Sequence, residues 1–292
     1  MLMCRLALPC VLLLLLTVTA RAGEPDAALR KAVTLYASFD EKVRADVAGG
    51  ERDLSTRFNH PTEKGQFVFD TGFDSKVFRI AKDKGKSGGA LEVVDVLPRN
   101  GRIFFPAEGN IAFKKRGWGG AVSVWINTDA DKLLKTSFCD PVQITQKGAN
   151  NGGIWFDFNN AKPRDLRMGL FPAVAAGAKG AAEADADAPM VRVAAVGFRQ
   201  GDWHHVVLNW RNLDTGRPDA EAVLYIDGKR IGALKDRPIA MDWDIDKAGI
   251  YVAVNFIGLL DELAVFNRAL TAEEVRRLHA QADVLATLKK GR

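Results

Sequence analysis

Two adjacent carboxylates near the end of the chain are flanked on both sides by apolar residues. Asp261 and Glu262 interrupt the apolar run Leu259–Phe266, which predicts a strand. Burying an ionised carboxylate is costly unless a hydrogen bond, a cation or a metal ion satisfies it. Alternation along a strand is expected to send the two carboxylates into different layers. The pair therefore predicts hydrogen bonding, an ion pair with Arg268, or metal binding.

A second group of residues has the composition that glycan binding requires, namely an aromatic ring beside amide and carboxylate groups that bond hydroxyls. In the predicted strand 154–159, Trp155, Asp157 and Asn159 share one face, opposite the apolar core face. Three later residues are candidates for the rest of the site: Trp243, Tyr251 and Asn255. The alternative is that Trp155 is covered packing, a frequent role of Trp in a two-layer sandwich.

Other residue patterns argue against common catalytic sites. His204 and His205 are neighbours on a predicted strand, so their side chains point to opposite faces and form no paired site. The histidines and cysteines show no spacing typical of zinc ligands. The stretch Gly85-Lys-Ser-Gly-Gly89 fits Gly-x-Ser-x-Gly, but it precedes a strand, whereas a nucleophile elbow lies between a strand and a helix. We interpret it as a turn.

The elements that would position these residues are short strands. Alternating or continuous apolar runs, separated by Gly, Asp, Asn and Pro, are typical of an all-β sandwich. We expect strands at 33–39, 66–70, 77–81, 90–94, 102–105, 121–127, 142–146, 154–158, 166–171, 191–196, 204–209, 222–226, 229–232, 250–254 and 259–266. Asp227-Gly228 predicts a two-residue hairpin turn. Residues 41–63 are expected to form a long loop.

Only the end of the chain predicts a helix, from Thr271 to about residue 289. Thr271 is expected to cap it, with Glu274 completing a capping box and Leu270 with Val275 forming a hydrophobic staple. The segment 173–189 is Ala-rich and lacks branched and aromatic side chains. We interpret it as a mobile insertion between two strands, with a surface helix as the alternative.

Three separated stretches together resemble the concanavalin A-like lectin/glucanase superfamily, and within it the laminin G-like jelly roll. They are Ser87–Val94 with Ala121–Asn127, then Gly201–Trp210 leading into Leu224–Lys229, and finally Leu260–Thr271. The resemblance implies a two-sheet antiparallel jelly-roll β-sandwich followed by a short C-terminal helix. This superfamily includes sugar-binding modules, adhesive modules and polysaccharide-cleaving enzymes, so fold alone sets only a broad expectation.

The resemblance also bears on catalysis and metal binding. Glycan-cleaving enzymes of this fold usually carry Glu-x-Asp-x-Glu on one strand, and this sequence lacks it; the nearest match, Glu183-Ala-Asp-Ala-Asp187, lies in the Ala-rich insertion. Polysaccharide lyases of related folds use other catalytic residues, so the missing motif does not exclude a lyase. The family also associates Asp261 with structural Ca²⁺ or main-chain contacts, and Asp40 occupies the other position that could join it. A structural Ca²⁺ is therefore a conditional expectation.

The start of the chain predicts export. Arg5 precedes an apolar run, and Ala20-Arg21-Ala22 has the form of a signal-peptidase site, so residues 1–22 are interpreted as a signal peptide, with an uncleaved anchor as the alternative. No later segment approaches membrane-spanning length. Residues 23–292 are expected to form one domain, and Cys139 is then the only cysteine that remains.

The charge argues against a nucleic-acid partner. The net charge of +5 includes Arg5 and Arg21, whose removal leaves 39 basic against 36 acidic residues, and the basic clusters are not interleaved with aromatic residues. We therefore expect a secreted, periplasmic or cell-surface protein that binds a carbohydrate without catalysis. A divergent polysaccharide-active enzyme and a protein-binding adhesive module are the alternatives, and the oligomeric state is not fixed by the sequence.

Overall fold

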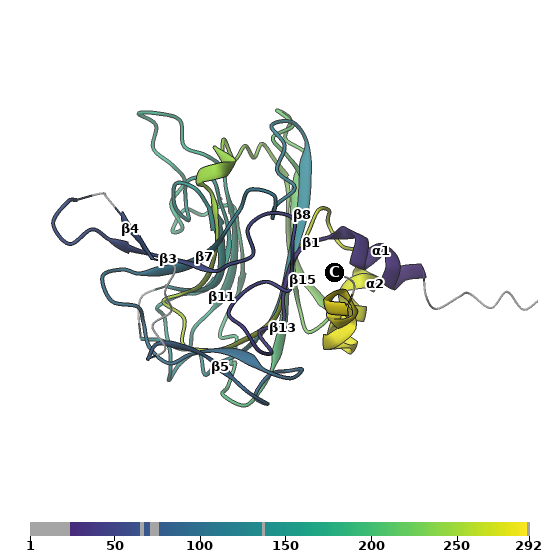
Figure 1. Ribbon diagram of the computed structural model, residues 1–292. Coiled ribbons are helices and arrows are strands. Elements are labelled where there is room, and N and C mark those ends of the chain that lie inside the picture. The colour runs from purple at the N-terminus through teal and green to yellow at the C-terminus, as the bar shows by residue number, and fades with distance from the viewer. Residues whose placement is uncertain (1–23, 65–66, 71–75, 136–137, 291–292) are drawn as a thin grey trace, which may run out of the picture.

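The computed structural model describes residues 24–64, 67–70, 76–135 and 138–290 of the chain. Within these residues the chain forms two antiparallel sheets packed face to face (Figure 1), which confirms the expected all-β jelly-roll sandwich. The expected signal peptide, residues 1–22, lies outside the described residues. No described helix is both long and apolar enough to cross a membrane.

One sheet, called here the back sheet, has nine strands in the order β15-β14-β13-β8-β17-β1-β2, with β6 joined to β17 and β5 to β6. The Asp227-Gly228 turn is confirmed, because both residues have positive φ (50° and 75°) and Ile226 pairs directly with Lys229. The bounds of its strands are β1 Val33–Ala37, β2 Val47–Ala48, β5 Phe78–Ala81, β6 Ala90–Val93, β8 Trp118–Asn127, β13 His204–Leu213, β14 Ala220–Ile226, β15 Lys229–Arg237 and β17 Gly258–Phe266.

The other sheet, called here the front sheet, has eight strands in the order β12-β11-β10-β9-β16-β7-β3-β4. Its strands are β3 Ser55–Asn59, β4 Phe67–Asp70, β7 Arg102–Pro106, β9 Cys139–Thr145, β10 Gly153–Phe158, β11 Leu166–Phe171, β12 Met190–Val193 and β16 Gly249–Val254. The expected long loop over 41–63 is wrong, because this segment contains β2 and β3. Within β3, only Thr56 is fully buried, so the strand has too little apolar alternation to be seen in the sequence.

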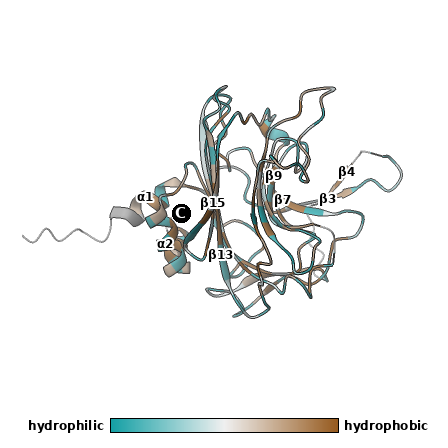
Figure 2. Ribbon diagram, turned by 180° about the vertical axis from the view of Figure 1, so that it is seen from behind, coloured by the Kyte–Doolittle hydropathy of each residue, from teal (hydrophilic) through white to brown (hydrophobic). Residues whose placement is uncertain are grey.

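The main apolar core fills the space between the two sheets and includes Ile154, Phe156 and Phe158, as the alternation on this strand predicts. A second apolar cluster lies between the outer face of the back sheet and the helices, and contains Leu29, Tyr36 and Leu278. Figures 1 and 2 show helices α1 (Glu24–Ala32) and α2 (Ala272–Ala280) together on this side of the molecule. The outer face of the front sheet is on the opposite side from these helices.

The C-terminal helix begins as predicted and ends earlier. Thr271 accepts a hydrogen bond from the backbone of Glu274, whose side chain bonds back to Thr271, so the capping box is confirmed. The α-helix stops at Ala280 because Gln281 leaves helical geometry (φ −136°, ψ 94°), and a separate 3₁₀ segment, η2, follows over Ala282–Lys290. A short 3₁₀ turn, η1, covers Ile245–Lys247. Helix α1 was not expected from the sequence.

Candidate functional site

The outer face of the front sheet carries a row of side chains in register across five strands. Phe104 pairs with Tyr251, Tyr251 with Gln143, Gln143 with Trp155, and Trp155 with Gly169. Since residues of one face alternate with core residues along each strand, these side chains all lie on the side away from the back sheet. The register therefore joins residues that are far apart in sequence into one surface.

A cavity of about 230 Å³ opens on this face. Its lining combines aromatic rings, amides, carboxylates and one guanidinium: Arg102, Phe138, Asp140, Gln143, Ala149, Trp155, Asp157, Glu183, Val254 and Asn255. Among the candidates named from sequence, Trp155, Asp157 and Asn255 are thus brought together. The lining has the mixture of apolar surface and convergent polar groups that small-molecule sites share.

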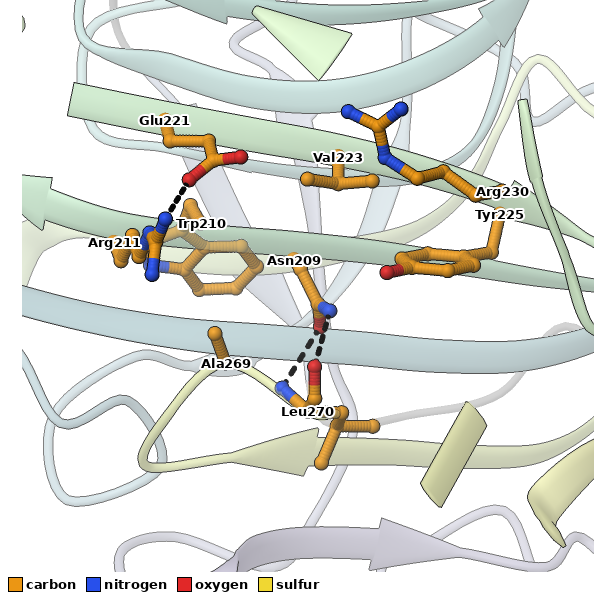
Figure 3. Close-up of a pocket in the computed structure, with 9 residues that line it drawn as sticks. All are labelled: Asn209, Trp210, Arg211, Glu221, Val223, Tyr225, Arg230, Ala269 and Leu270. Carbon is orange, nitrogen blue, oxygen red and sulfur yellow. Dashed lines mark hydrogen bonds and ion pairs between the residues drawn. The ribbon is translucent and has the colours of Figure 1, made fainter. Parts of the chain in front are cut away.

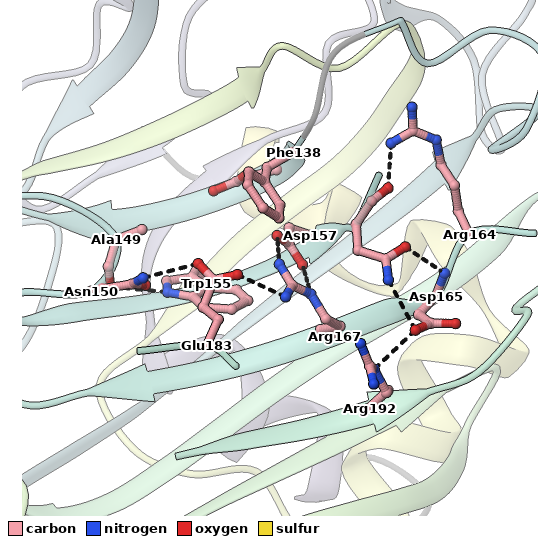
Figure 4. Close-up of polar contacts among 12 residues, drawn as sticks. Phe138, Ala149, Asn150, Trp155, Asp157, Arg164, Asp165, Arg167, Glu183 and Arg192 are labelled. Carbon is pink, nitrogen blue, oxygen red and sulfur yellow. Dashed lines mark hydrogen bonds and ion pairs between the residues drawn. The ribbon is translucent and has the colours of Figure 1, made fainter. Parts of the chain in front are cut away.

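Arg167 on β11 is the centre of a buried ion-pair network beside this cavity (Figure 4). Its Nε donates to Asp157 Oδ1 at 2.9 Å, its Nη2 donates to Asp157 Oδ2, and its Nη1 donates to Glu183 Oε2 at 2.7 Å. The Arg167 side chain is only 4% exposed. A bidentate arginine–carboxylate pair fixes both partners in orientation, so Asp157 and Glu183 form a rigid wall.

Burial raises the pKa of two aspartates that line this cavity, Asp157 and Asp140. Burial raises the pKa of Asp157 to about 6, against the opposing hydrogen bonds from Arg167. Burial, followed by the charge of Asp157, raises the pKa of Asp140 well above its ordinary value. Gln143 Nε2 also donates to Asp140 Oδ2 at 2.8 Å. Asp140 therefore tends toward its neutral form and adds less negative charge than an exposed aspartate would.

Trp155 is covered packing, the alternative given from the sequence, and is not an exposed ring on which a ligand could stack. Its side chain is 1% exposed, its Nε1 donates to Ala149 O at 2.9 Å, and its ring stacks on Phe171 at 5.6 Å between centroids. On β11 its cross-strand neighbour is Gly169, where a Cβ atom would come within 2.3 Å of the indole. Trp155 is thus packed flat against the sheet and contributes to the floor of the cavity.

Three other sequence candidates lie outside the cavity. Trp243 is in the core between the sheets, and its Nε1 donates to Gly152 O at 2.8 Å. Asn159 is buried and exchanges hydrogen bonds with Asp165. Tyr251 is buried beside Phe104, with ring centroids 5.3 Å apart, so it borders the cavity without lining it. Trp243 lies in the connection between β15 and η1, so its burial in the core depends on long-range packing.

Several residues that line or support the cavity were not predicted from the sequence, and Phe138 provides its exposed aromatic ring. Phe138 is 41% exposed and lies with its ring 5.1 Å from the Arg167 guanidinium, so it offers the stacking surface that Trp155 does not. Arg167 alternates with buried Leu166 and Met168 on β11, and that alternation could have placed it on the same face as Asp157. Glu183 carried no such signal, because it lies in the Ala-rich insertion.

Asp40 and Asp261 both accept backbone hydrogen bonds from the Gly85–Gly89 turn. Asp40 Oδ1 accepts from Gly89 N at 2.9 Å, and Lys289 donates to its Oδ2. Asp261 accepts from Ser87 N at 3.0 Å and from Glu262 N at 2.8 Å. Arg268, the expected partner, pairs instead with Glu274.

All four carboxylate oxygens of Asp40 and Asp261 therefore already accept a bond from the chain. No described group of three His, Cys, Asp or Glu residues has the geometry of a metal site. Ca²⁺ at this position stays a prediction.

Glu262 is expected to make the protein less stable as the pH rises. Burial raises its pKa to about 8, although Tyr36 O–H donates to Oε2 at 2.6 Å, and Oε1 lacks a partner among the described residues. The unfolded chain releases this proton near the ordinary value of 4.5, so between about 4.5 and 8 the folded state binds more protons and loses stability with rising pH.

Replacement Glu262→Gln removes this ionisation and keeps an acceptor for Tyr36. We expect the variant to be more stable than the unchanged protein by ~2 kcal/mol or more at pH 8–9, with a smaller gain at pH 5. Urea unfolding at several pH values measures this, with exposed Glu108→Gln as the control. A difference between the Glu262 variant and the unchanged protein that is the same at every pH would contradict the buried-acid account.

A second cavity, of about 210 Å³, lies on the outer face of the back sheet (Figure 3). Its charged groups are largely engaged, because Arg211 pairs with Glu221 and Asn209 holds both the N–H and the C=O of Leu270. Asn209 thus fixes the chain as it enters α2. We interpret these contacts as part of helix docking, and the front-sheet cavity remains the better candidate for a ligand.

The fold and the sequence together define the class of this protein as a jelly-roll domain. The chain belongs to the concanavalin A-like lectin/glucanases superfamily, because the model of a laminin G-like family in it matches residues 117–276, more than half of the chain. This confirms the resemblance found in the sequence. A comparison with curated proteins found no match.

Solved structures with a similar arrangement of strands include carbohydrate-associated and toxin domains. Domain 4 of AbnA, a GH43 extracellular arabinanase from Geobacillus stearothermophilus in complex with arabinotriose, has 17% identity and a TM-score of 0.48, covering 85% of this chain and 98% of that one. The CBM40 of the Ruminococcus gnavus IT-sialidase, bound to α2,3 sialyllactose, has 14% identity and a TM-score of 0.43, covering 65% and 95%.

The binding domain of Paraclostridial Mosquitocidal Protein 1 has 13% identity and a TM-score of 0.47. The match covers 78% of this chain and 51% of that one, so this chain spans about half the length of that structure.

Proposed function

We propose that this is an exported, non-catalytic protein that binds a carbohydrate in the cavity of the front sheet. The observation that carries the proposal is the cavity lining, in which the exposed ring of Phe138 stands beside the amides of Gln143 and Asn255 and the fixed carboxylates of Asp157 and Glu183. Such a set suits a sugar, since the ring stacks on its apolar face while amides and carboxylates bond its hydroxyls. Membership in a superfamily that contains lectins supports the same class of ligand.

Replacement Phe138→Ala is expected to weaken glycan binding at least tenfold and to leave stability nearly unchanged. The expectation follows because the ring is 41% exposed, so its loss removes contact area for a ligand and opens no core cavity. A glycan array followed by titration with the strongest binder measures the effect. Ile231→Ala, at 43% exposure on the back sheet, is the matched control. Equal affinities for the two variants would count against this site.

Polysaccharide cleavage is a second candidate, favoured by the three carboxylates Asp140, Asp157 and Glu183 in one cavity. Retaining hydrolysis needs one carboxylate free to attack, with its partner roughly 5–5.5 Å away. Asp157 and Glu183 are both engaged by Arg167, which disfavours either as a nucleophile. Incubation of the protein with a panel of polysaccharides separates the two candidates: released reducing ends or unsaturated sugars would support the enzyme, and binding without release would support the lectin.

A further inference from the structure

Two arginines face each other at the β3–β7 end of the front sheet. Arg57 and Arg102 are direct register partners, and both lie on the outer face because Thr56 and Ile103 point into the core. Side chains placed directly opposite have Cβ atoms roughly 4.5–5.5 Å apart, and like charges in this position are destabilising. An anion that lies between or beside the two groups would offset this repulsion.

The described part of the chain supplies no such anion as an ion-pair partner. The Arg57 guanidinium lies over the rings of Phe67 and Tyr251, 4.2 and 4.7 Å from their centroids, and its Nε is buried without a partner. Arg102 donates to Gly101 O at 2.8 Å and to Asn255 Oδ1 at 3.4 Å, both of which are uncharged. The aromatic rings hold Arg57 in place, and the charge of both arginines stays available.

The neighbouring carboxylates do not remove this charge. Asp157 and Glu183 are engaged by Arg167, and Asp140 is buried and bonded to Gln143. Burial, opposed by Asp140 and reinforced by the charge of Arg57, lowers the pKa of Arg102. The described residues thus place two guanidinium groups without an ion-paired carboxylate at the Arg57–Arg102 end of the outer face, whereas at the Arg167 end two carboxylates share one guanidinium.

We propose that Arg57 and Arg102 bind a carboxylate or sulfate group of an anionic glycan. The inference rests on the proposed function and specifies its ligand class. Arg102 lines the front-sheet cavity itself, so a glycan whose hydroxyls meet Gln143 and Asn255 places its acidic group next to the arginine pair. Guanidinium groups suit these oxyanions because their planar N–H donors match two oxygens at once.

The experiment uses a glycan array with neutral, uronate-bearing and sulfated chains, followed by titration with polygalacturonate, dextran sulfate and neutral dextran. We expect binding to the acidic class, weakened at least tenfold in Arg57→Gln and in Arg102→Gln, with partial recovery in the Lys variants. The control Arg230→Gln changes an arginine at the back-sheet cavity. Comparing polygalacturonate with dextran sulfate decides between carboxylate and sulfate.

Stability separates ligand binding from a structural role. Without ligand, each Gln variant is expected to leave the melting temperature nearly unchanged, because relief of the like-charge contact offsets the lost ring or hydrogen-bond contacts of the arginine. Binding to neutral chains alone, or acidic binding unchanged in both Gln variants, would overturn the anion site and leave the proposed function intact. A lower melting temperature together with unchanged binding would assign the pair a structural role and overturn the inference as well. No binding to any class on the array would overturn both.

Discussion

Replacing Arg167 with Met is expected to lower the free energy of unfolding by about 3–5 kcal/mol. The change leaves Asp157 buried without its bidentate partner and frees Glu183, while the methionine keeps most of the apolar stem. Breaking one side of a buried ion pair is costly because the remaining charge cannot be solvated. Urea unfolding at pH 7 measures the loss, and Arg192→Met is the matched control.

Arg192 makes one ion pair with Asp165 at 2.9 Å, and its side chain is 60% exposed, so its replacement should cost about 0–1 kcal/mol. A double variant sharpens the test. Arg167→Met combined with Asp157→Leu should recover part of the lost stability, because apolar packing can replace a buried ion pair. Similar losses for Arg167 and Arg192, or no recovery in the double variant, would show that the network does not stabilise the front sheet.

Replacement Trp155→Ala is expected to cost about 3–5 kcal/mol of stability. The indole is fully covered, and Gly169 on the neighbouring strand leaves the space that it fills. If this variant loses glycan binding, the loss could therefore arise from disruption of the front sheet as well as from removal of the indole ring. Phe138→Ala is the informative companion, since binding should fall while stability stays within about 0.5 kcal/mol.

Thermal and urea unfolding of Trp155→Ala and Phe138→Ala, measured beside their glycan affinities, separates the two roles. Trp155→Ala with unchanged stability would mean that the indole is not packed as described. If Phe138→Ala instead unfolds as readily as Trp155→Ala, its ring belongs to the core and another group must provide the stacking surface.

Local patterns in the sequence predicted much of the sandwich because they depend on near neighbours. Alternation on 154–158 placed Ile154, Phe156 and Phe158 in the core, and Asp227-Gly228 predicted the hairpin. The sequence did not predict β3, because a strand with only one buried side chain shows little alternation of apolar and polar residues. The predicted C-terminal helix is longer than the observed one, because the stripe of apolar residues on which the prediction depends continues past Gln281 into a 3₁₀ segment.

By itself the sequence determined the class of the domain, its two-layer architecture and the strand that forms part of the front-sheet cavity. Only the tertiary structure decided which side chains are exposed and which charges are paired. Trp155 is buried and forms the floor of the cavity instead of an exposed ring. Glu183, from the Ala-rich insertion, pairs with Arg167. Arg57 lies opposite Arg102 in the register of β3 and β7. The physical reason is that the alternation of apolar and polar residues predicts only which face of a strand a side chain is on. Burial by other segments, ion pairing and cross-strand register depend on parts of the chain that folding brings together.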